Sequence, residues 1–306
     1  MIERPLTSHD ICAVIVTYNP DDALPHRVTC IADQVGGVVI VDNHSDTSAL
    51  SMMHRLTPTI NLIANSVNLG VATALNQGVC WAHQHGHKFA LLLDQDSEPM
   101  DSMVETLVKI YNGFVPKDKL AMVAANSYNK ESHRIDIEVP AQNGEDWGEV
   151  KQAITSGSLI RLQAFRDVGP FRDDFFIDGV DFEYCLRARR KGYKIILSVE
   201  PLMYHSAGIP QKHTLMGKTV WTLNHNATRC YYITRNYIVL LREYFFRDPK
   251  WIILYSWSTL KWFAKLCFFE TDRIHKLGQV FIGIGHGFVG RSKHTLEHKK
   301  QFYSFE

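Results

Sequence analysis

The sequence lacks the cysteine spacings that mark disulfide frameworks and zinc sites. Its six cysteines never form a C-x-x-C pair, and most of them lie inside apolar runs. Such cysteines are typical of reduced thiols in a protein core. The opening residues MIERPLTSHD also lack the basic and then apolar pattern of a secretion signal. We therefore expect a cytoplasmic protein without disulfide bonds or cysteine-bound zinc.

Long uncharged runs are missing from the aromatic-rich segment near the end of the sequence. The longest one there, residues 251–260, has half of the roughly 20 residues that a membrane-spanning helix needs, which excludes a span in this segment. With 45% hydrophobic and 21% charged residues, the 306-residue chain has the composition of a globular protein with one large core or two smaller ones.

Charge is distributed unevenly along the chain, although the net charge is only +1. Residues 1–206 hold 18 Lys and Arg and 26 Asp and Glu, which gives −8, whereas residues 207–306 hold 15 and 6, which gives +9. A basic, aromatic tail after an acidic body suggests that the tail faces something anionic.

Short apolar runs alternate with helical patterns through the first half of the chain. The runs that we expect to form strands are at residues 11–18, 37–42, 61–64, 89–94 and 120–125. Helices are expected between them at about residues 22–34 and 71–85. Strands that are apolar throughout and alternate with helices predict an α/β fold with a mostly parallel sheet, covered on both faces. Such sheets bind ligands beyond the carboxyl ends of their strands.

Acidic and amide residues follow three of these runs, in the segments TYNPDD, DNHSD and DQDSE. The last segment holds Asp94 and Asp96, spaced one residue apart. An ordinary polar turn is one interpretation of this pair. The other is a site for a divalent cation, because an extended Asp-x-Asp presents both carboxylates on one face, within reach of an ion such as Mg²⁺. Three such segments at one edge of a sheet favour a nucleotide-like ligand.

The segment 154–195 contains a helix that begins with acids. We expect an amphipathic helix that opens between Asp178 and Asp181 and runs to about residue 191. Acids in a first helical turn are favoured by the helix dipole, which by itself explains Asp178, Asp181 and Glu183. Asp181, however, follows the FFIDG loop, where its carboxylate can face a cavity instead of capping the helix.

Eight motifs occur in order between about residues 10 and 245: VIVTYNP, VDNHSD, NLGVATALNQG, LLLDQDSEP, SGSLI, VGPFRDDFFIDGVDFEYCLRARRKGY, YHSAG and YYITRNYIVLLREY. Together they resemble the pattern of the inverting nucleotide-sugar glycosyltransferases of family 2, which have the GT-A fold. The DQD form and the TRN of the last motif resemble the rhamnosyltransferases of that family in particular.

The resemblance implies a domain organisation. A GT-A domain, with a Rossmann-like, mostly parallel sheet flanked by helices, would occupy residues 1–210 and bind the nucleotide sugar and the acceptor. A mostly helical, basic and aromatic region would occupy residues 211–306 and serve membrane contact or oligomerisation.

The resemblance also implies roles for individual residues. Asp94 and Asp96 match the metal and nucleotide motif, where Mg²⁺ or Mn²⁺ neutralises the departing diphosphate, and His205 matches a histidine near the metal. Asp181 matches the catalytic base, which gives a single displacement that inverts the anomeric centre. The other positions expected on the nucleotide-sugar side are Thr17, Asn19, Asp42, Asn68, Gly70, Gln95 and Arg235. The positions expected on the acceptor side are Gly157, Asp178 and Glu183.

The sequence departs from the family pattern at the base. Many relatives read Glu-Asp-x-Asp, whereas this chain reads VDFE at residues 180–183, so the acid before the base is lost. Asp178 is therefore a rival to Asp181. Two further assignments have ordinary alternatives: His205 as a hydrogen-bonded surface or core histidine, and Arg235 as a solvated or snorkelling residue.

The segment 251–269 is dense in aromatic residues and places Ser258, Lys261 and Lys265 on one helical stripe. A basic, amphipathic, Trp-rich helix suits the interface of an anionic membrane. The alternative is that its apolar face packs on the catalytic domain or on a second subunit. A lipid-linked acceptor would favour peripheral binding to the inner face of the cytoplasmic membrane.

The resemblance therefore implies transfer of a sugar, L-rhamnose from dTDP-L-rhamnose, to a lipid-linked saccharide or glycan in cell-surface glycan synthesis. A UDP-hexose is the alternative donor. A sugar-nucleotide pyrophosphorylase is disfavoured, since TYNPDD lacks the Gly-rich, basic loop that holds a triphosphate. A non-enzymatic membrane scaffold would explain the basic tail but not the ordered acids. We expect no nucleic-acid partner and leave a homo-oligomer open.

Overall fold

The computed structural model describes residues 4–56, 60–130, 133–142, 144–204, 211–215 and 217–293. Within these residues the chain forms two compact units. The first unit takes in the described residues up to Asp173 and again from Val180 to Tyr204. The second takes in residues 174–179 and the described residues from Gln211 onwards. The chain thus joins the second unit briefly, directly before the helix that carries Asp181.

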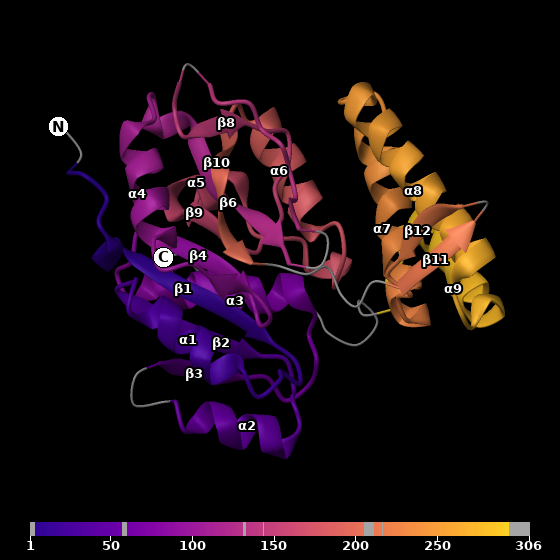
Figure 1. Ribbon diagram of the computed structural model, residues 1–306, viewed down its shortest axis with the longest axis horizontal. Helices are drawn as coiled ribbons and strands as arrows, with labels where there is room; N and C mark the ends of the chain where they lie inside the picture. The colour runs from indigo at the N-terminus through magenta and orange to yellow at the C-terminus, as the bar shows by residue number, and fades with distance from the viewer. Residues whose placement is uncertain are drawn as a thin grey trace. The chain divides into compact units, whose positions relative to one another are not determined.

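The first unit is built on a mixed sheet (Figure 1), whose strands follow the order β3-β2-β1-β4-β9-β6-β10-β5. The parallel half consists of β1 (Ile11–Thr17), β2 (Gly37–Asp42), β3 (Asn61–Ala64) and β4 (Phe89–Asp94). The other half consists of β5 (Glu98–Pro99), β6 (Leu120–Asn129), β9 (Ser158–Arg161) and β10 (Lys194–Tyr204). Two short strands, β7 (Arg134–Ile135) and β8 (Trp147–Glu149), pair with β6 and β10.

The sheet keeps one strand direction except at β9 and three short strands. β9 runs antiparallel to both β4 and β6, whereas β10 is parallel to β6. β5, β7 and β8 also pair antiparallel. The bounds of β2, β3 and β4 are those that the apolar runs predict, while β6 continues to Asn129. Its last residues are polar, so the run of apolar residues did not mark them as strand.

Helices cover the sheet of the first unit. They are α1 (Leu24–Ala32), α2 (Thr47–His54), α3 (Val71–Gln84), α4 (Met103–Gly113), α5 (Leu162–Val168) and α6 (Val180–Arg190). Short 3-10 helices lie at Ser8–Asp10, Lys117–Lys119 and Asp173–Phe175. α1 begins two residues later than the sequence predicts, with Pro25 in its first turn, where a missing N–H group costs little.

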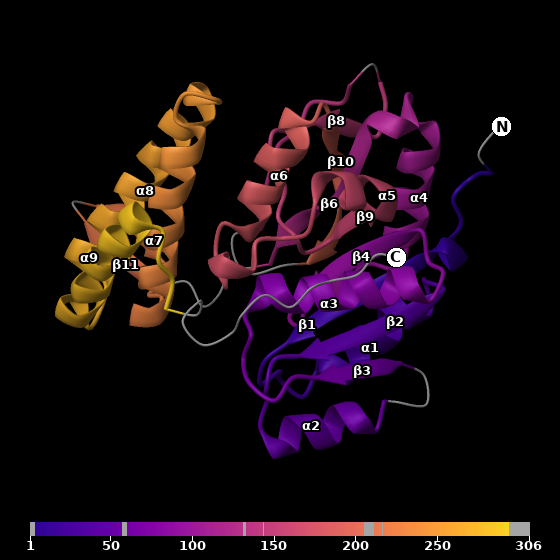
Figure 2. The same cartoon turned by 180° about the vertical axis from the view of Figure 1, so that it is seen from behind.

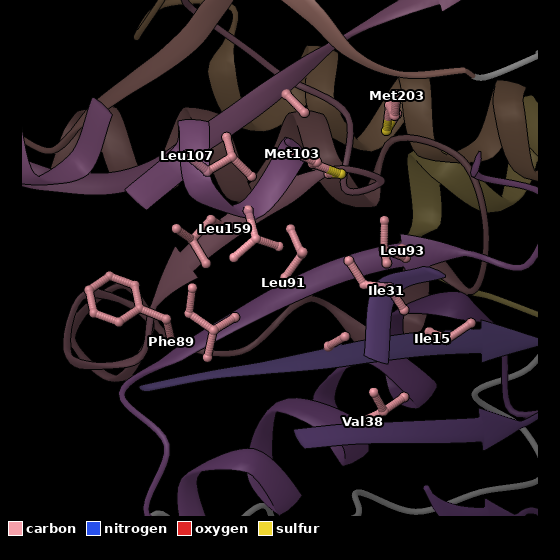
Figure 3. Close-up of a cluster of buried hydrophobic side chains, with 14 of the residues drawn as sticks. Ile15, Ile31, Val38, Phe89, Leu91, Leu93, Met103, Leu107, Leu159 and Met203 are labelled. Carbon is pink, nitrogen blue, oxygen red and sulfur yellow. The ribbon is translucent and has the colours of Figure 1, made fainter. Parts of the chain in front are cut away.

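Both faces of the sheet are packed, as strands that are apolar throughout require. All residues of β1 are buried. On one face, Ile15 belongs to a cluster with Ile31 of α1 and Leu107 of α4 (Figure 3). On the other face, a Cβ added at Gly78 of α3 would lie 2.2 Å from Val14 Cγ1. The absence of a side chain at residue 78 therefore lets α3 pack directly on β1.

In its described residues the second unit is a bundle of three helices beside a hairpin (Figures 1 and 2). The helices are α7 (Ala227–Tyr244), α8 (Pro249–Phe269) and α9 (Arg273–Val289), and the hairpin is β11 (Gln211–Leu215) with β12 (Lys218–Thr222). α9 packs against α7 through glycines, since a Cβ at Gly283 would lie 2.6 Å from the carbonyl oxygen of Tyr231. Among the helices described, we find none with the length and apolar character that crossing a bilayer demands.

Candidate functional site

The carboxyl ends of three parallel strands bring predicted site residues to one edge of the sheet. Thr17 ends β1 and is paired with Asp42 at the end of β2, while Asp94 at the end of β4 is paired with Val16. The edge that the sequence predicted as a ligand site is therefore present in the first unit.

Thr17 and Asp42 form the buried base of this edge. The Thr17 hydroxyl donates to Asp42 Oδ1 at 2.9 Å, and the backbone N–H of Ser45 donates to Asp42 Oδ2 at 2.8 Å. The Ser45 hydroxyl also donates to Asp42. Neither Thr17 nor Asp42 is more than 1% exposed. In the structure, Thr17 and Asp42 support the loop after β2. Their contact with a nucleotide stays a prediction.

Asn19 and Gln95 connect the loops above that base. Asn19 is exposed and has a positive φ of 48°. Its N–H donates to the Ser45 hydroxyl at 2.7 Å, and its side-chain oxygen accepts from the N–H of Asp46 at 2.8 Å. Gln95 Oε1 accepts from the N–H of Tyr18 at 2.7 Å. Asn19 also lines a surface hollow of about 440 Å³ between this loop and α2.

Asn68 and Gly70 shape the start of α3. The side-chain oxygen of Asn68 accepts from the N–H of Gly70 at 2.9 Å, and Gly70 has a φ of +84° that favours glycine. Asn43, which the sequence analysis did not single out, donates from Nδ2 to the Gly70 carbonyl at 3.0 Å. The three residues join the end of β2 to the start of α3.

Asp94 and Asp96 lie in a tight turn, which corrects the extended geometry assumed for them. The N–H of Ser97 donates to the Asp94 carbonyl at 3.2 Å, so the chain reverses directly after β4. The N–H of Asp94 in turn donates to the Ser156 hydroxyl at 3.2 Å. Asp94 is half-buried and Asp96 is exposed. The polar-turn interpretation therefore describes the backbone correctly. The turn leaves both carboxylates at the carboxyl edge of the sheet.

The donor set at this turn suits a magnesium ion held jointly with a ligand. In the part of the chain that the structure describes, no three His, Cys, Asp or Glu residues are grouped so as to hold a metal by themselves. Mg²⁺, however, is commonly bound by one or two carboxylates together with substrate phosphates. Asp94 and Asp96 fit that requirement. His205, the third predicted ligand, lies outside the described residues.

Gly157 occupies a position that only glycine fills without strain. Its φ is +77°, and an added Cβ would lie 2.7 Å from Met203 Sδ. Its N–H donates to the Leu92 carbonyl at 2.8 Å, and its carbonyl accepts from the N–H of Ala125 at 2.9 Å. Gly157 therefore forms a tight turn directly before β9, while its role on the acceptor side stays a prediction.

Asp181 lies in the first turn of α6 and is half-buried. Its Oδ1 accepts from the N–H of Phe182 at 2.8 Å, so one oxygen caps an N–H of the first turn of α6, which begins at Val180. The positive end of the helix dipole favours a negative charge here. Capping and a role as base are therefore compatible for this carboxylate.

Glu183 is buried and paired within its own helix. Its Oε2 lies 2.8 Å from Arg187 Nη2, one turn further along α6. Arg187 also donates to the carbonyl oxygens of Val168 and Pro170, at 2.9 and 2.8 Å. The pair fastens α6 to the turn after α5, so the structure gives Glu183 a supporting role, and its acceptor-side role stays a prediction.

Asp178, the rival base, belongs to the second unit and is held by an arginine. Arg229 Nη2 lies 3.0 Å from Asp178 Oδ1, and Nε lies 3.1 Å from Oδ2. Burial raises the pKa of the Asp178 carboxyl, and the charge of Arg229 opposes that rise. A carboxylate whose two oxygens accept from one guanidinium is a poor candidate for a base, because the ion pair must be disturbed for a proton to be taken up.

Arg235 is neither solvated nor snorkelling, the two alternatives considered from sequence. It is 1% exposed, and its guanidinium pairs with Asp174 at 2.8 Å. It also donates to the carbonyl of Arg291 at 3.0 Å and to the side chain of Asn236 at 2.9 Å. All three nitrogens of the guanidinium are thus in use inside the second unit, and contact with a diphosphate would require some of these bonds to break.

The comparisons with known proteins agree with this architecture. The sequence matches glycosyl transferase family 2 over residues 12–167, just over half of the chain. The chain belongs to glycosyl transferase family 2. It is 29% identical over 244 residues to dTDP-rhamnosyl transferase RfbF of Shigella flexneri, a similarity that covers 76% of this chain and 80% of that protein.

Solved structures show the same fold. TarS from S. aureus has a TM-score of 0.53 at 12% identity, and the match covers 94% of this chain but only 46% of the TarS chain. A shorter form of TarS in complex with UDP has a TM-score of 0.53 at 13% identity, covering 94% of this chain and 75% of that one. The predicted family 2 membership and GT-A-like α/β fold are thus confirmed.

Several family 2 motifs contain supporting residues that the sequence analysis quoted but did not assign. Ser156 from SGSLI contacts Asp94, and Ser45 from VDNHSD contacts Asp42. Arg27 of α1 lies outside these motifs. It donates to the Gln95 carbonyl at 2.9 Å and pairs with Asp21 at 2.7 Å. The motifs that contain them could have pointed to the two serines, whereas no sequence pattern around Arg27 marked it as a supporting residue.

Proposed function

We propose that the protein transfers L-rhamnose from dTDP-L-rhamnose to a hydroxyl group of a glycan or lipid-linked saccharide, with inversion at the anomeric carbon. The observation that carries this proposal is the similarity to RfbF over 80% of that protein's length. A UDP-sugar is the second candidate donor, since the structurally similar TarS was solved with UDP and with UDP-GlcNAc.

In the proposed reaction Asp181 acts as the general base. The acceptor oxygen forms a bond to the anomeric carbon while its proton passes to the Asp181 carboxylate. The bond from that carbon to the diphosphate breaks, and the electron pair leaves with the diphosphate. Because one displacement occurs, the configuration at the anomeric carbon is inverted. The position of Asp181 at the start of α6, half-buried, supports this assignment.

Mg²⁺ or Mn²⁺ is proposed as the cofactor, held by Asp94 and Asp96 together with the phosphates of the donor. The ion would neutralise the charge that develops on the diphosphate. This chain's contribution is the turn after β4, which keeps both carboxylates at the carboxyl edge of the sheet.

A panel of nucleotide sugars tests the donor. With Mg²⁺ present, we expect faster release of nucleoside diphosphate from dTDP-L-rhamnose than from dTDP-glucose, UDP-glucose or UDP-GlcNAc. Because dTDP-glucose carries the same nucleobase as dTDP-L-rhamnose, it separates recognition of the sugar from recognition of the nucleobase. Faster turnover of a UDP-sugar would contradict the rhamnose donor, and no turnover of any donor, with or without saccharide acceptors, would contradict sugar transfer itself.

We further propose that the second unit binds the surface of an anionic membrane. α8 is apolar on two sides: Trp251, Ile252 and Leu266 are buried in the bundle, whereas Leu254, Trp257 and Leu260 are 65%, 58% and 56% exposed. α9 adds further exposed apolar residues, namely Ile274, Phe281, Ile282, Phe288 and Val289. An exposed apolar surface of this kind commonly marks an interaction site.

The charge near this surface favours lipid headgroups as its partner. Lys261 is exposed and lies over the Trp257 ring, 5.3 Å from its centroid, and the net charge of residues 207–306 is +9. From the sequence, the apolar side of this helix is expected to be either packed or inserted in a membrane. The structure has apolar residues on both sides of α8, so packing within the bundle does not account for all of them.

Vesicle binding tests the membrane proposal. The protein should bind anionic vesicles, and binding should weaken with salt, because headgroup attraction is screened over roughly 8 Å at physiological ionic strength. Changing Lys261 and Lys265 to Glu should reduce binding, and should reduce transfer to a lipid-linked acceptor more than to a soluble one. Cosedimentation and the two transfer rates are the measurements.

A matched control removes the effect of net charge. Changing Lys119 and Lys151, which are exposed in the first unit, to Glu alters the total charge equally and should leave vesicle binding near that of the wild type. If the wild-type protein ignores anionic vesicles at low salt, or if the Lys261 and Lys265 variant dissociates an oligomer, the surface is a subunit interface instead.

A further inference from the structure

The loop at residues 174–179, directly before the base helix, has an uncommon backbone conformation. Phe176, Asp178 and Gly179 have φ angles of +59°, +65° and +77°. A positive φ is disfavoured for residues with a side chain, above all for a bulky one. Such a backbone conformation persists only where surrounding groups hold it. The loop must therefore be fixed by contacts outside itself.

α7 supplies an amide that holds the backbone of this loop. Asn236 is buried, and its Nδ2 donates to the carbonyl oxygens of Phe175, Ile177 and Asp178 at 2.9, 2.9 and 2.7 Å. One side-chain amide of α7 thus contacts three backbone carbonyl oxygens of the loop.

Three more side chains of α7 hold the side chains of the loop. Arg235 pairs with Asp174, and Arg229 pairs with Asp178. The ring of Tyr232 stacks on Phe176, with centroids 4.8 Å apart. Together with Asn236, these residues of α7 form what we call the loop clamp, which comprises Arg229, Tyr232, Arg235 and Asn236.

The chain before the loop is anchored to the first unit. The side chain of Asn76 on α3 donates to Asp173 at 2.9 Å and to the Phe171 carbonyl at 2.8 Å. Thr73 donates to Asp173 at 3.1 Å. The segment that leads to Asp181 is therefore held by α3 up to Asp173 and by the loop clamp from Asp174 onwards.

We infer that the loop clamp positions the catalytic carboxylate: by fixing residues 174–179 it sets the backbone from which Asp181 follows two residues later. Asp178 is then an anchor of the loop and not the base. The inference rests on the proposed function, in which Asp181 takes the acceptor proton. It also gives the TRN stretch of the last motif a physical role, since Arg235 and Asn236 belong to it.

The pair of Arg229 and Asp178 offers the sharpest test, because the Arg229 side chain is 40% exposed and its replacement should leave the buried clamp residues in place. Arg229→Met, Asp178→Asn and the double variant are compared with the wild type. Each single variant should lower kcat by roughly tenfold, since small displacements of a catalytic group are costly, and the KM for the donor should stay within about twofold. The double variant should be no slower than the singles, because both remove one interaction.

Two further variants separate positioning from general damage. Arg229→Lys keeps the charge and should recover part of kcat. Arg247→Met, at an exposed arginine that follows α7, should behave as the wild type. Hydrogen exchange gives a readout that needs no substrate: amides of residues 174–179 should exchange faster in Arg229→Met, with the melting temperature nearly unchanged.

Two results would overturn the inference. If Asp178→Asn is as damaging as Asp181→Asn while Arg229→Met keeps its rate, Asp178 is the base. If the hydrogen exchange of the loop amides and the transfer rates of all Arg229 and Asp178 variants match those of the wild type, the loop clamp does not position Asp181. A wild-type protein that turns over no sugar donor, with or without acceptor, would instead contradict the proposed function, and faster loop exchange would still establish the clamp.

Discussion

Replacing Asp181 by asparagine is expected to lower turnover by on the order of 10²-fold or more. Asparagine keeps the size of the side chain, and its oxygen can still accept the N–H of Phe182, so α6 should keep its cap. It cannot take the proton of the acceptor hydroxyl at neutral pH. The fall should therefore appear in kcat, while the affinity for the donor, measured by nucleotide-sugar binding, stays close to that of the wild type.

The comparison with Asp178 makes the result decisive. Asp178→Asn should cost only the roughly tenfold that we expect from a loosened loop. Asp181→Asn should remain the slower enzyme at every pH at which both are folded. A crippled Asp178→Asn together with a nearly normal Asp181→Asn would show that we have assigned the base to the wrong carboxylate.

The second large effect is expected at the turn after β4. Asp96→Ala should remove most of the transfer activity, because a metal ion held by Asp94 and Asp96 to neutralise the diphosphate would lose a ligand. The melting temperature should hardly change, since Asp96 is exposed and the backbone bond from Ser97 to Asp94 does not need its side chain. Transfer rates at increasing Mg²⁺ and Mn²⁺, with thermal unfolding in parallel, measure both effects.

Asp101 provides the matched control, because it is also an exposed aspartate in the chain segment that follows β4. Asp101→Ala should keep the activity of the wild type. A chelator should abolish transfer by the wild type, and added Mg²⁺ or Mn²⁺ should restore it. Full activity of the wild type in the presence of the chelator would remove the metal from the mechanism.

The polar residues at the edge of the sheet show how far sequence patterns reach. Apolar runs placed β1, β2 and β4, and because parallel strands share a direction, Thr17, Asp42 and Asp94 were predicted at one edge. The patterns did not show that Thr17 and Asp42 are buried and bonded to each other. Burial of a polar pair depends on the residues that pack over it. Here Ser45 from the loop after β2 contacts Asp42, and Met53 from α2 contacts Thr17.

The sequence by itself determined the class of the fold, the sheet edge at which the predicted site residues lie, and the family, because these depend on local periodicity and on motifs that are read in order. Only the tertiary structure decided which side chains hold Asp178 and Arg235, since the identity of these partners depends on packing. Asp178 and Arg235 meet Arg229 and Asp174, each more than 50 residues away in sequence. Such pairs leave no periodic signal, because the folded backbone alone brings the two side chains together.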